Sequence, residues 1–147
     1  MVAPQPCFKE LNLYKPFTGS EFGELLPSLV YRILVKAKLT ADSIFLDLGC
    51  GAGNVVAQAS LQCACKSYGV DIEAAPITLA LQMIKMLKSR CKLGDVPCGD
   101  MQVRQEDLKK SQMVNEMLPR ADLILFNNRS FLPSCLSPYF SLDSPSL

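Results

Sequence analysis

The segment 44–56 constrains the fold more than any other part of the chain. It reads Ile-Phe-Leu-Asp-Leu-Gly-Cys-Gly-Ala-Gly-Asn-Val-Val. The apolar run at 44–48 predicts a buried parallel strand, and three glycines at alternate positions lead into a helical pattern. Glycine permits a tight turn and lets a ligand lie against the backbone, and the start of the helix offers unpaired N–H groups. The segment therefore predicts a nucleotide-binding loop between a strand and a helix.

The spacing of the glycines indicates which nucleotide. Gly49, Gly51 and Gly53 form G-x-G-x-G, whereas the dinucleotide fingerprint G-x-G-x-x-G needs glycine where Asn54 stands. No Gly-Lys-Ser/Thr follows, which excludes a phosphate-binding Walker loop. With Asp47 the pattern resembles motif I of the class I S-adenosylmethionine-dependent methyltransferases, whose loop approaches the methionine part of the cofactor. The alternative is an ordinary glycine-rich turn.

Polar side chains follow the predicted strands at their carboxyl ends. A second strand, 67–71, ends at Asp71, near the spacing expected for an acid that accepts hydrogen bonds from ribose hydroxyls. A solvated strand-end acid is the alternative. Asp47, Asp107 and Asn127 also stand at strand ends, and ligand groups in open α/β sheets belong there. The sequence therefore predicts one site along one edge of the sheet.

The remaining patterns complete an α/β alternation. Strands are predicted at 44–48, 67–71, 101–105 and 121–126, and helices at 24–37, 53–63, 75–90 and 109–117. In the third helix we expect Ile77, Leu81, Ile84 and Leu87 to face inward. The prediction is a Rossmann-like α/β fold with parallel strand order 3-2-1-4. The fold is expected to be incomplete, because about three more strands normally follow and no such pattern continues after residue 131.

Composition narrows the classes of function. The chain has 147 residues, enough for one domain, and 49% hydrophobic against 20% charged residues predicts a folded protein. The net charge of +1 and the absence of a strong basic patch give no reason to expect direct DNA binding. No apolar run approaches a membrane span of roughly 18 residues. Seven cysteines without C-x-x-C pairs, and no histidine, predict reduced thiols, no metal site and no Ser-His or Cys-His catalysis.

Composition and periodicity divide the chain into three segments. Residues 1–21 contain several prolines and are expected to be an extended lead-in. Residues 22–131 carry the α/β pattern and form the predicted catalytic domain, which is partial. Residues 132–147 are rich in serine and proline, and we expect them to be a divergent tail.

With these residues placed, the chain resembles the DOT (disruptor of telomeric silencing) family of histone-lysine methyltransferases, which use the seven-strand methyltransferase fold instead of a SET domain. The resemblance runs from about Phe22 to Phe131. It rests on five segments. Residues 22–25 are similar to the family's Tyr-Gly-Glu segment, 47–56 to its glycine loop and 65–71 to its second strand. Residues 106–108 stand where the family has an acid near the adenine, and 126–131 are similar to its Val-Asn-Asn-aromatic segment.

The resemblance implies the cofactor and the reaction. S-adenosylmethionine would be the methyl donor, and a deprotonated lysine amine would attack its methyl carbon in line. Asn127 would lie beside the methyl-transfer site as the catalytic residue. The residues implied to bind the cofactor are Phe22, Glu24, Asp47, Gly49, Gly51, Gly53, Asn54, Asp71, Asp107 and Leu108.

The resemblance also implies a nuclear enzyme whose substrate is a lysine on the exposed face of histone H3 in the nucleosome. Two alternatives stay open: a methyltransferase for another protein or a small molecule, and a cofactor-binding remnant without turnover. The change of character at Arg129 is expected for a truncated product, a splice variant or a frame change. We accordingly expect little activity from the 147 residues alone.

Overall fold

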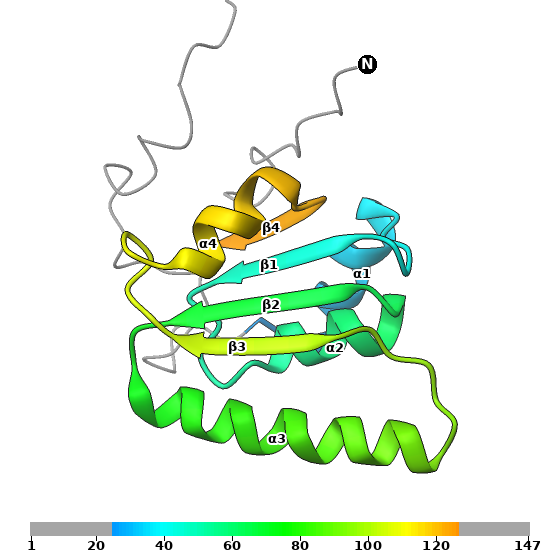
Figure 1. The fold of residues 1–147 in the computed structure, drawn as a ribbon. Helices are drawn as coiled ribbons and strands as arrows, with labels where there is room; N and C mark the ends of the chain where they lie inside the picture. Colours follow the sequence, from blue (N-terminus) through cyan, green and yellow to red (C-terminus); the bar gives the residue numbers. More distant parts are fainter. Residues whose placement is uncertain (1–24, 127–147) are drawn as a thin grey trace, which may run out of the picture.

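The computed structural model describes residues 25–126 and arranges them as one α/β unit (Figure 1). Helices and strands alternate along the chain from a first helix to a last strand. The elements are α1 (Pro27–Ala37), β1 (Ile44–Leu48), α2 (Asn54–Cys63), β2 (Lys66–Asp71), α3 (Ala74–Leu93), β3 (Met101–Gln105), α4 (Gln112–Met117), the 3-10 helix η2 (Leu118–Arg120) and β4 (Leu123–Phe126).

The four strands form one parallel sheet in the order β3-β2-β1-β4. Leu46 in β1 is paired with Tyr68 of β2 on one side and with Ile124 of β4 on the other. All the strands point the same way, so their carboxyl ends lie along one edge (Figure 1). The predicted strand order and α/β class are confirmed.

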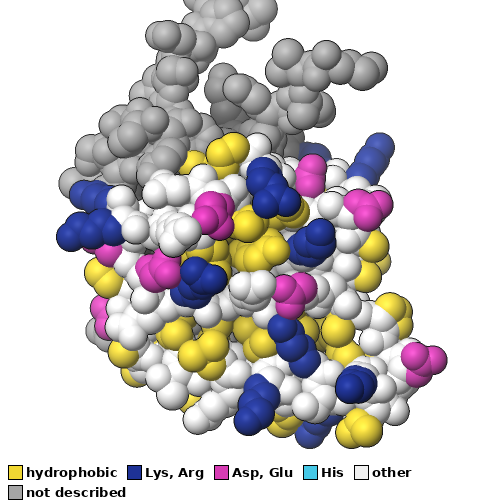
Figure 2. Space-filling model, in the orientation of Figure 1, with side chains coloured by type: hydrophobic (Ala, Val, Ile, Leu, Met, Phe, Trp, Pro, Cys, Tyr) yellow, Lys and Arg dark blue, Asp and Glu magenta, His cyan; other side chains and the backbone are white. Residues whose placement is uncertain are grey.

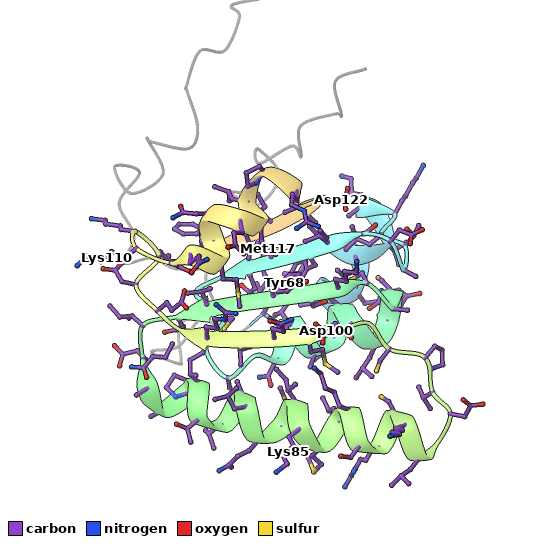
Figure 3. The ribbon with its side chains drawn as sticks, viewed as in Figure 1. Tyr68, Lys85, Asp100, Lys110, Met117 and Asp122 are labelled. Carbon is purple, nitrogen blue, oxygen red and sulfur yellow. The ribbon has the colours of Figure 1, made fainter. Side chains whose placement is uncertain are left out.

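Both faces of the sheet are covered, which explains why β1 and β4 read as nearly continuous apolar runs. Successive side chains of β1 alternate between the faces: Leu46 packs toward α4, and Phe45 packs toward α1 and α2. Tyr68 and Met117 lie on the α4 side (Figure 3). On the other face α3 packs against β3, where Met101 and Val103 are buried. The core is thus two layers divided by the sheet.

The prediction of which α3 residues face inward is partly wrong. Leu81 was expected to face inward, but its side chain is 52% exposed. Ala80 is fully buried instead, between Ile77 and Ile84 in the same cluster. Position 80 approaches the glycine loop, because a Cβ placed on Gly53 would come within 3.1 Å of the Ala80 Cβ. Only a small side chain fits where two helices and a loop meet this closely.

The last helix begins later than predicted. Residues 109–117 were expected to be helical, but α4 starts at Gln112. Ser111 caps it, since its Oγ accepts a hydrogen bond from the Val114 N–H at 3.1 Å. Lys109 instead belongs to a turn in which its N–H donates to the Asp107 carboxylate at 3.0 Å.

The surface is mixed in charge over most of the visible face, where Lys and Arg side chains alternate with Asp and Glu (Figure 2). None of the helices within residues 25–126 has the length and apolar character of a membrane span. Three of the cysteines in this range, Cys50, Cys65 and Cys91, are buried as free thiols.

Gly69 in β2 packs against the glycine loop and the first turn of α2, and its substitution tests how close this packing is. A Cβ at position 69 would lie 2.8 Å from the Cys50 Cβ and from the Val56 Cγ2. We expect Gly69→Ala to lower the free energy of unfolding by about 1–3 kcal/mol, because overpacking forces these neighbours apart. Urea denaturation measures the change. Gly94→Ala is the control, because a Cβ at this helix end would lie 3.3 Å from the nearest atom, the Arg90 carbonyl oxygen. Equal denaturation midpoints for both variants would contradict the close approach at Gly69.

Candidate active site

The loop between β1 and α2 has the backbone conformation that its glycines predict. Gly49, Gly51 and Gly53 have φ values of 88°, 52° and 77°, in the left-handed region that other residues rarely adopt. Gly53 is the residue immediately before α2. At Gly51 no atom lies within 4 Å of the position that a Cβ would occupy. The loop therefore presents bare backbone toward open space.

The loop is fastened to the end of β2 by hydrogen bonds. The N–H groups of Gly49 and Cys50 both donate to the Val70 carbonyl, at 2.8 and 3.1 Å. The Gly51 N–H donates to the Asp71 Oδ2 at 2.8 Å. The other oxygen of Asp71 accepts from the Glu73 N–H at 2.9 Å. Asp71 thus joins the glycine loop to the start of α3 and is held in one orientation.

The segment after β3 completes this edge of the sheet. The Glu106 N–H donates to the Asp71 carbonyl at 3.0 Å, which ties the exit of β3 to the end of β2. Ser111 donates a hydrogen bond from its Oγ to the Glu106 carboxylate. The turn closed by the Asp107 carboxylate then places Leu108 beside the end of β1. Glu106 and Ser111 thereby help to position Asp107 and Leu108, which lie between them in the sequence.

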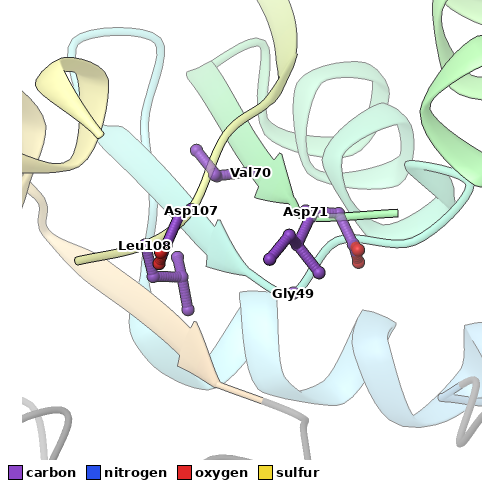
Figure 4. A pocket seen from close by; sticks show the side chains of 6 residues that line it. Gly49, Val70, Asp71, Asp107 and Leu108 are labelled. Atoms are coloured by element: carbon purple, nitrogen blue, oxygen red, sulfur yellow. The ribbon is translucent and has the colours of Figure 1, made fainter. Parts of the chain in front are cut away.

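These three segments line a small, shallow pocket that is partly open to solvent. Gly49 lies between Asp71, from the end of β2, and the Asp107-Leu108 pair after β3 (Figure 4). The lining residues are Gly49, Val70, Asp71, Ile72, Asp107 and Leu108. The pocket combines two carboxylates, a bare glycine and apolar side chains, a set that suits a ligand with a flat apolar ring and hydroxyl groups.

Asp47 lies in β1 directly before this loop, and its side chain is only 2% exposed. Burial, and secondly the negative charge of Asp71, raise the pKa of Asp47 to about 7. Burial also raises the pKa of the Cys50 thiol, and Asp47 and Asp71 add to that effect. The site therefore holds two acidic groups close together, one of them in a medium where its charge is costly.

The structure brings four of the predicted site residues together in the pocket: Gly49, Asp71, Asp107 and Leu108. The other predicted residues of the described range adjoin it without lining it. Asp47 is buried in β1, Gly51 and Gly53 shape the loop, and Asn54 is the exposed first residue of α2. The predicted positions Phe22, Glu24 and Asn127 lie outside the described residues.

Sequence reasoning missed two residues of the pocket, Val70 and Ile72. Val70 was assigned only to the strand. Ile72 follows the strand-end acid and is 56% exposed, although it is a large apolar residue. Such a residue directly after an acidic strand end was the available signal, because exposed apolar side chains at a strand end suit contact with a ligand.

The fold and this loop define a class of protein. A parallel sheet in this order, with G-x-G-x-G after its first strand and an acid after its second, is the Rossmann-like fold of class I S-adenosylmethionine-dependent methyltransferases. An RNA methyltransferase from Salinibacter ruber, solved with S-adenosyl-L-homocysteine, superposes with a TM-score of 0.55 at 22% identity, over 78% of this chain and 67% of its own. A tRNA methyltransferase from Aquifex aeolicus gives a TM-score of 0.50 at 17% identity, over 64% and 34% of the two chains.

The sequence places the chain more narrowly. Residues 1–137 match the family model described as histone methylation protein DOT1, and the chain belongs to that family. Two similar relatives are named histone-lysine N-methyltransferase, H3 lysine-79 specific. The one from Kluyveromyces lactis is 38% identical over 86% of this chain and 22% of its own length. The one from Aspergillus fumigatus is 34% identical over 87% and 26%. The chain thus spans about a quarter of the length of these relatives.

The raised pKa of Asp47 makes a prediction about stability and pH. The folded chain keeps this proton to about pH 7, whereas an unfolded chain loses it near the ordinary value of 3.8. Unfolding therefore releases a proton between these values, and the folded state loses stability as the pH rises from about 4 to 7. Asp47→Asn removes the penalty and should raise the free energy of unfolding at pH 8 by on the order of 2–4 kcal/mol, with little change at pH 4.

Denaturant unfolding at both pH values measures this difference. Asp42→Asn is the control, because Asp42 is an exposed acid at the turn before β1. A stabilisation by Asp47→Asn that is the same at pH 4 and pH 8 would mean that the buried charge is not its cause.

Proposed function

We propose that this chain forms the cofactor-binding part of a histone-lysine N-methyltransferase that uses S-adenosylmethionine. The observation that carries the proposal is the pocket at the ends of β1, β2 and β3, in which Gly49, Asp71, Asp107 and Leu108 meet in a chain of the DOT1 family. The curated relatives are named for histone H3 lysine-79. By extension the substrate is a lysine of histone H3, the partner is the nucleosome, and the location is the nucleus.

The described residues fit the adenosine half of the cofactor. Each Asp71 oxygen accepts one backbone N–H, and a carboxylate has about four acceptor positions, which leaves capacity for the two ribose hydroxyls. Ile72 and Leu108 line the same pocket and offer apolar contacts to the adenine ring. The Asp107 carboxylate takes a backbone N–H from Lys109 through one oxygen and has a second oxygen for a ring amino group.

The methionine half would lie against the glycine loop. The open space beside Gly51 allows a ligand to approach the backbone there. S-adenosylmethionine supplies an electrophilic methyl group on a positively charged sulfur. Asp47 and Asp71 would favour a cation at this place, since a nearby positive charge stabilises the ionised form of both acids.

The remaining groups of the site would come from the flanking segments. Phe22 and Glu24 would close over the cofactor, and Asn127 would orient the groups around the methyl being transferred. The protein's share in the reaction would be to align the lysine amine, exclude water and orient dipoles. No side chain would form a covalent intermediate.

Removal of the Asp71 charge tests the cofactor site. We expect Asp71→Asn to weaken S-adenosylhomocysteine binding by about 2 kcal/mol, or about thirtyfold, because hydrogen bonds to the charged carboxylate are lost. The amide oxygen of Asn can still accept the Gly51 N–H, so the loop should keep its conformation. Titration calorimetry measures both affinities. The control is Glu73→Gln, at an exposed acid two residues further on that does not line the pocket. Equal affinity in wild type and Asp71→Asn would rule out the ribose contact.

Methyl transfer tests the function itself. Residues 1–131 would be joined to the segment that follows the matched region in the Kluyveromyces lactis relative. Labelled cofactor would be offered with nucleosomes, free histones and small amines. We expect label on histone H3 in nucleosomes, and we expect Asn127→Ala to lower kcat by at least about tenfold with little change in cofactor affinity.

The same experiment separates the alternatives. Label on small amines or on another protein, with none on histone H3, would indicate a different methyltransferase. Cofactor binding without transfer to any acceptor would indicate a non-catalytic binding protein. For the 147-residue chain we expect cofactor binding, measured by the same calorimetry.

A further inference from the structure

Helix α3 carries a second apolar stripe on the side opposite its buried face. Its inward side chains are Ile77, Ala80, Ile84 and Cys91, all buried. Leu79, Met86 and Leu93 recur at seven-residue steps and are 60%, 49% and 89% exposed. At 100° per residue they fall within a narrow arc, about half a turn from the buried side. Large apolar side chains in this register, directed to solvent, are unusual for a helix that has already buried one face.

The charged residues of α3 itself are all cations. The sequence of α3, AAPITLALQMIKMLKSRCKL, contains four cations and no acid. Lys88 is paired with Asp100 at 2.8 Å, but within residues 25–126 the structure records no ion pair for Lys85, Arg90 or Lys92. Lys85 and Lys92 flank the stripe on one side and Arg90 on the other. Figure 2 shows Lys and Arg side chains mixed with hydrophobic ones at the lower edge of the molecule, where α3 lies, and Figure 3 shows Lys85 on the outer side of this helix.

We propose that this outer face of α3 docks an acidic amphipathic helix of a partner protein. The residues one turn before each large side chain are small or polar: Ala75, Gln82 and Ser89. Leu79, Met86 and Leu93 then act as knobs with gaps between them, which is the surface that a facing helix with heptad apolar residues fits. Glutamate or aspartate beside those apolar residues would pair with Lys85, Arg90 and Lys92.

The charges and the narrow apolar stripe of α3 favour an acidic helix over a second copy of the chain, nucleic acid or a membrane. A second copy of α3 would bring Lys85, Arg90 and Lys92 against the same cations with no acid of the helix to pair them. Nucleic acid needs cations at the point of contact, whereas the most exposed ridge here is apolar. An anionic membrane needs a broad apolar face to insert, but Gln82 and Ser89 interrupt the stripe.

The surface is separate from the pocket and independent of the proposed function. Leu93 is the last residue of α3, and the helix begins three residues after Asp71. None of Leu79, Met86 and Leu93 lines the pocket, and because a helix of 20 residues is about 30 Å long, the second half of α3 lies far from it. In Figure 1 that end lies on the side of the strands' amino ends. A partner bound there would leave the pocket accessible.

The test uses two designed helical peptides, each about three heptads long with the same leucine positions. One is flanked by glutamates and the other by lysines. Binding of each to the 147-residue chain is measured by fluorescence anisotropy at low and high salt. We expect the acidic peptide to bind at least about tenfold more tightly than the basic one, and salt to weaken its binding.

Variants then locate the binding. Met86→Glu should weaken binding of the acidic peptide by about tenfold or more, because it removes a buried contact and adds a like charge. The double variant Lys85→Glu with Arg90→Glu should reverse the preference toward the basic peptide. Val35→Glu, at an exposed apolar residue of α1, is the control and should leave binding unchanged. Circular dichroism melts check that each variant is folded.

Four outcomes would overturn the proposal: equal binding of both peptides, no binding of either at millimolar concentration, a charge-reversed variant with unchanged preference, or a Val35→Glu effect as large as that of Met86→Glu. Sedimentation of a dimer that Met86→Glu dissociates would assign the face to a second copy. Binding to duplex DNA or to anionic phosphatidylserine vesicles that Met86→Glu abolishes would assign it to those partners.

Discussion

The hydrogen bond from the Gly51 N–H to the Asp71 carboxylate holds the site together. It joins the glycine loop to the end of the neighbouring strand β2. The glycines of this loop have no side chains that could make such a contact. The same carboxylate also accepts a hydrogen bond from the Glu73 N–H at the start of α3. The backbone carbonyl of Asp71 accepts one from the Glu106 N–H at the exit of β3. Three segments far apart in the sequence thus meet at Asp71. Asp71 both orients the loop and lines the pocket. A variant that removes both of its carboxylate oxygens would therefore disturb the loop and the ligand contacts together.

The strands were the most predictable part of the fold. Ile44–Leu48 and Met101–Gln105 occupy the predicted residues, and their order follows from the handedness of parallel crossovers. Both strands are bounded by polar or glycine residues, which mark the strand ends in the sequence. The pocket followed from the same rule, since Asp71 and Asp107 stand at carboxyl ends of adjacent strands. Backbone topology, once known, places these acids without any knowledge of side-chain packing.

The errors arose where side-chain packing decides. Leu81 was assigned to the core because α3 has apolar residues in two registers, and the periodicity of apolar residues alone does not say which register is buried. Ala80 is in the core because the glycine loop leaves room only for a methyl group, which is a property of the folded structure. The start of α4 was missed for a similar reason. Ser111 caps the helix and so fixes its start at Gln112, because its hydroxyl accepts from the Val114 N–H and donates to the Glu106 carboxylate.

The buried Asp47 connects stability to ligand binding. A carboxyl group at 2% exposure beside a second acid destabilises the folded domain at neutral pH, and a leucine or asparagine in β1 would avoid that cost. A bound cation would reverse the balance, because the positive charge lowers the pKa of Asp47 and turns two repelling acids into partners. Binding and deprotonation would then be linked, each favouring the other. On this reasoning the charge of the cofactor, as much as its shape, would select what the glycine loop retains, and a neutral thioether analogue would gain less from Asp47 than a sulfonium.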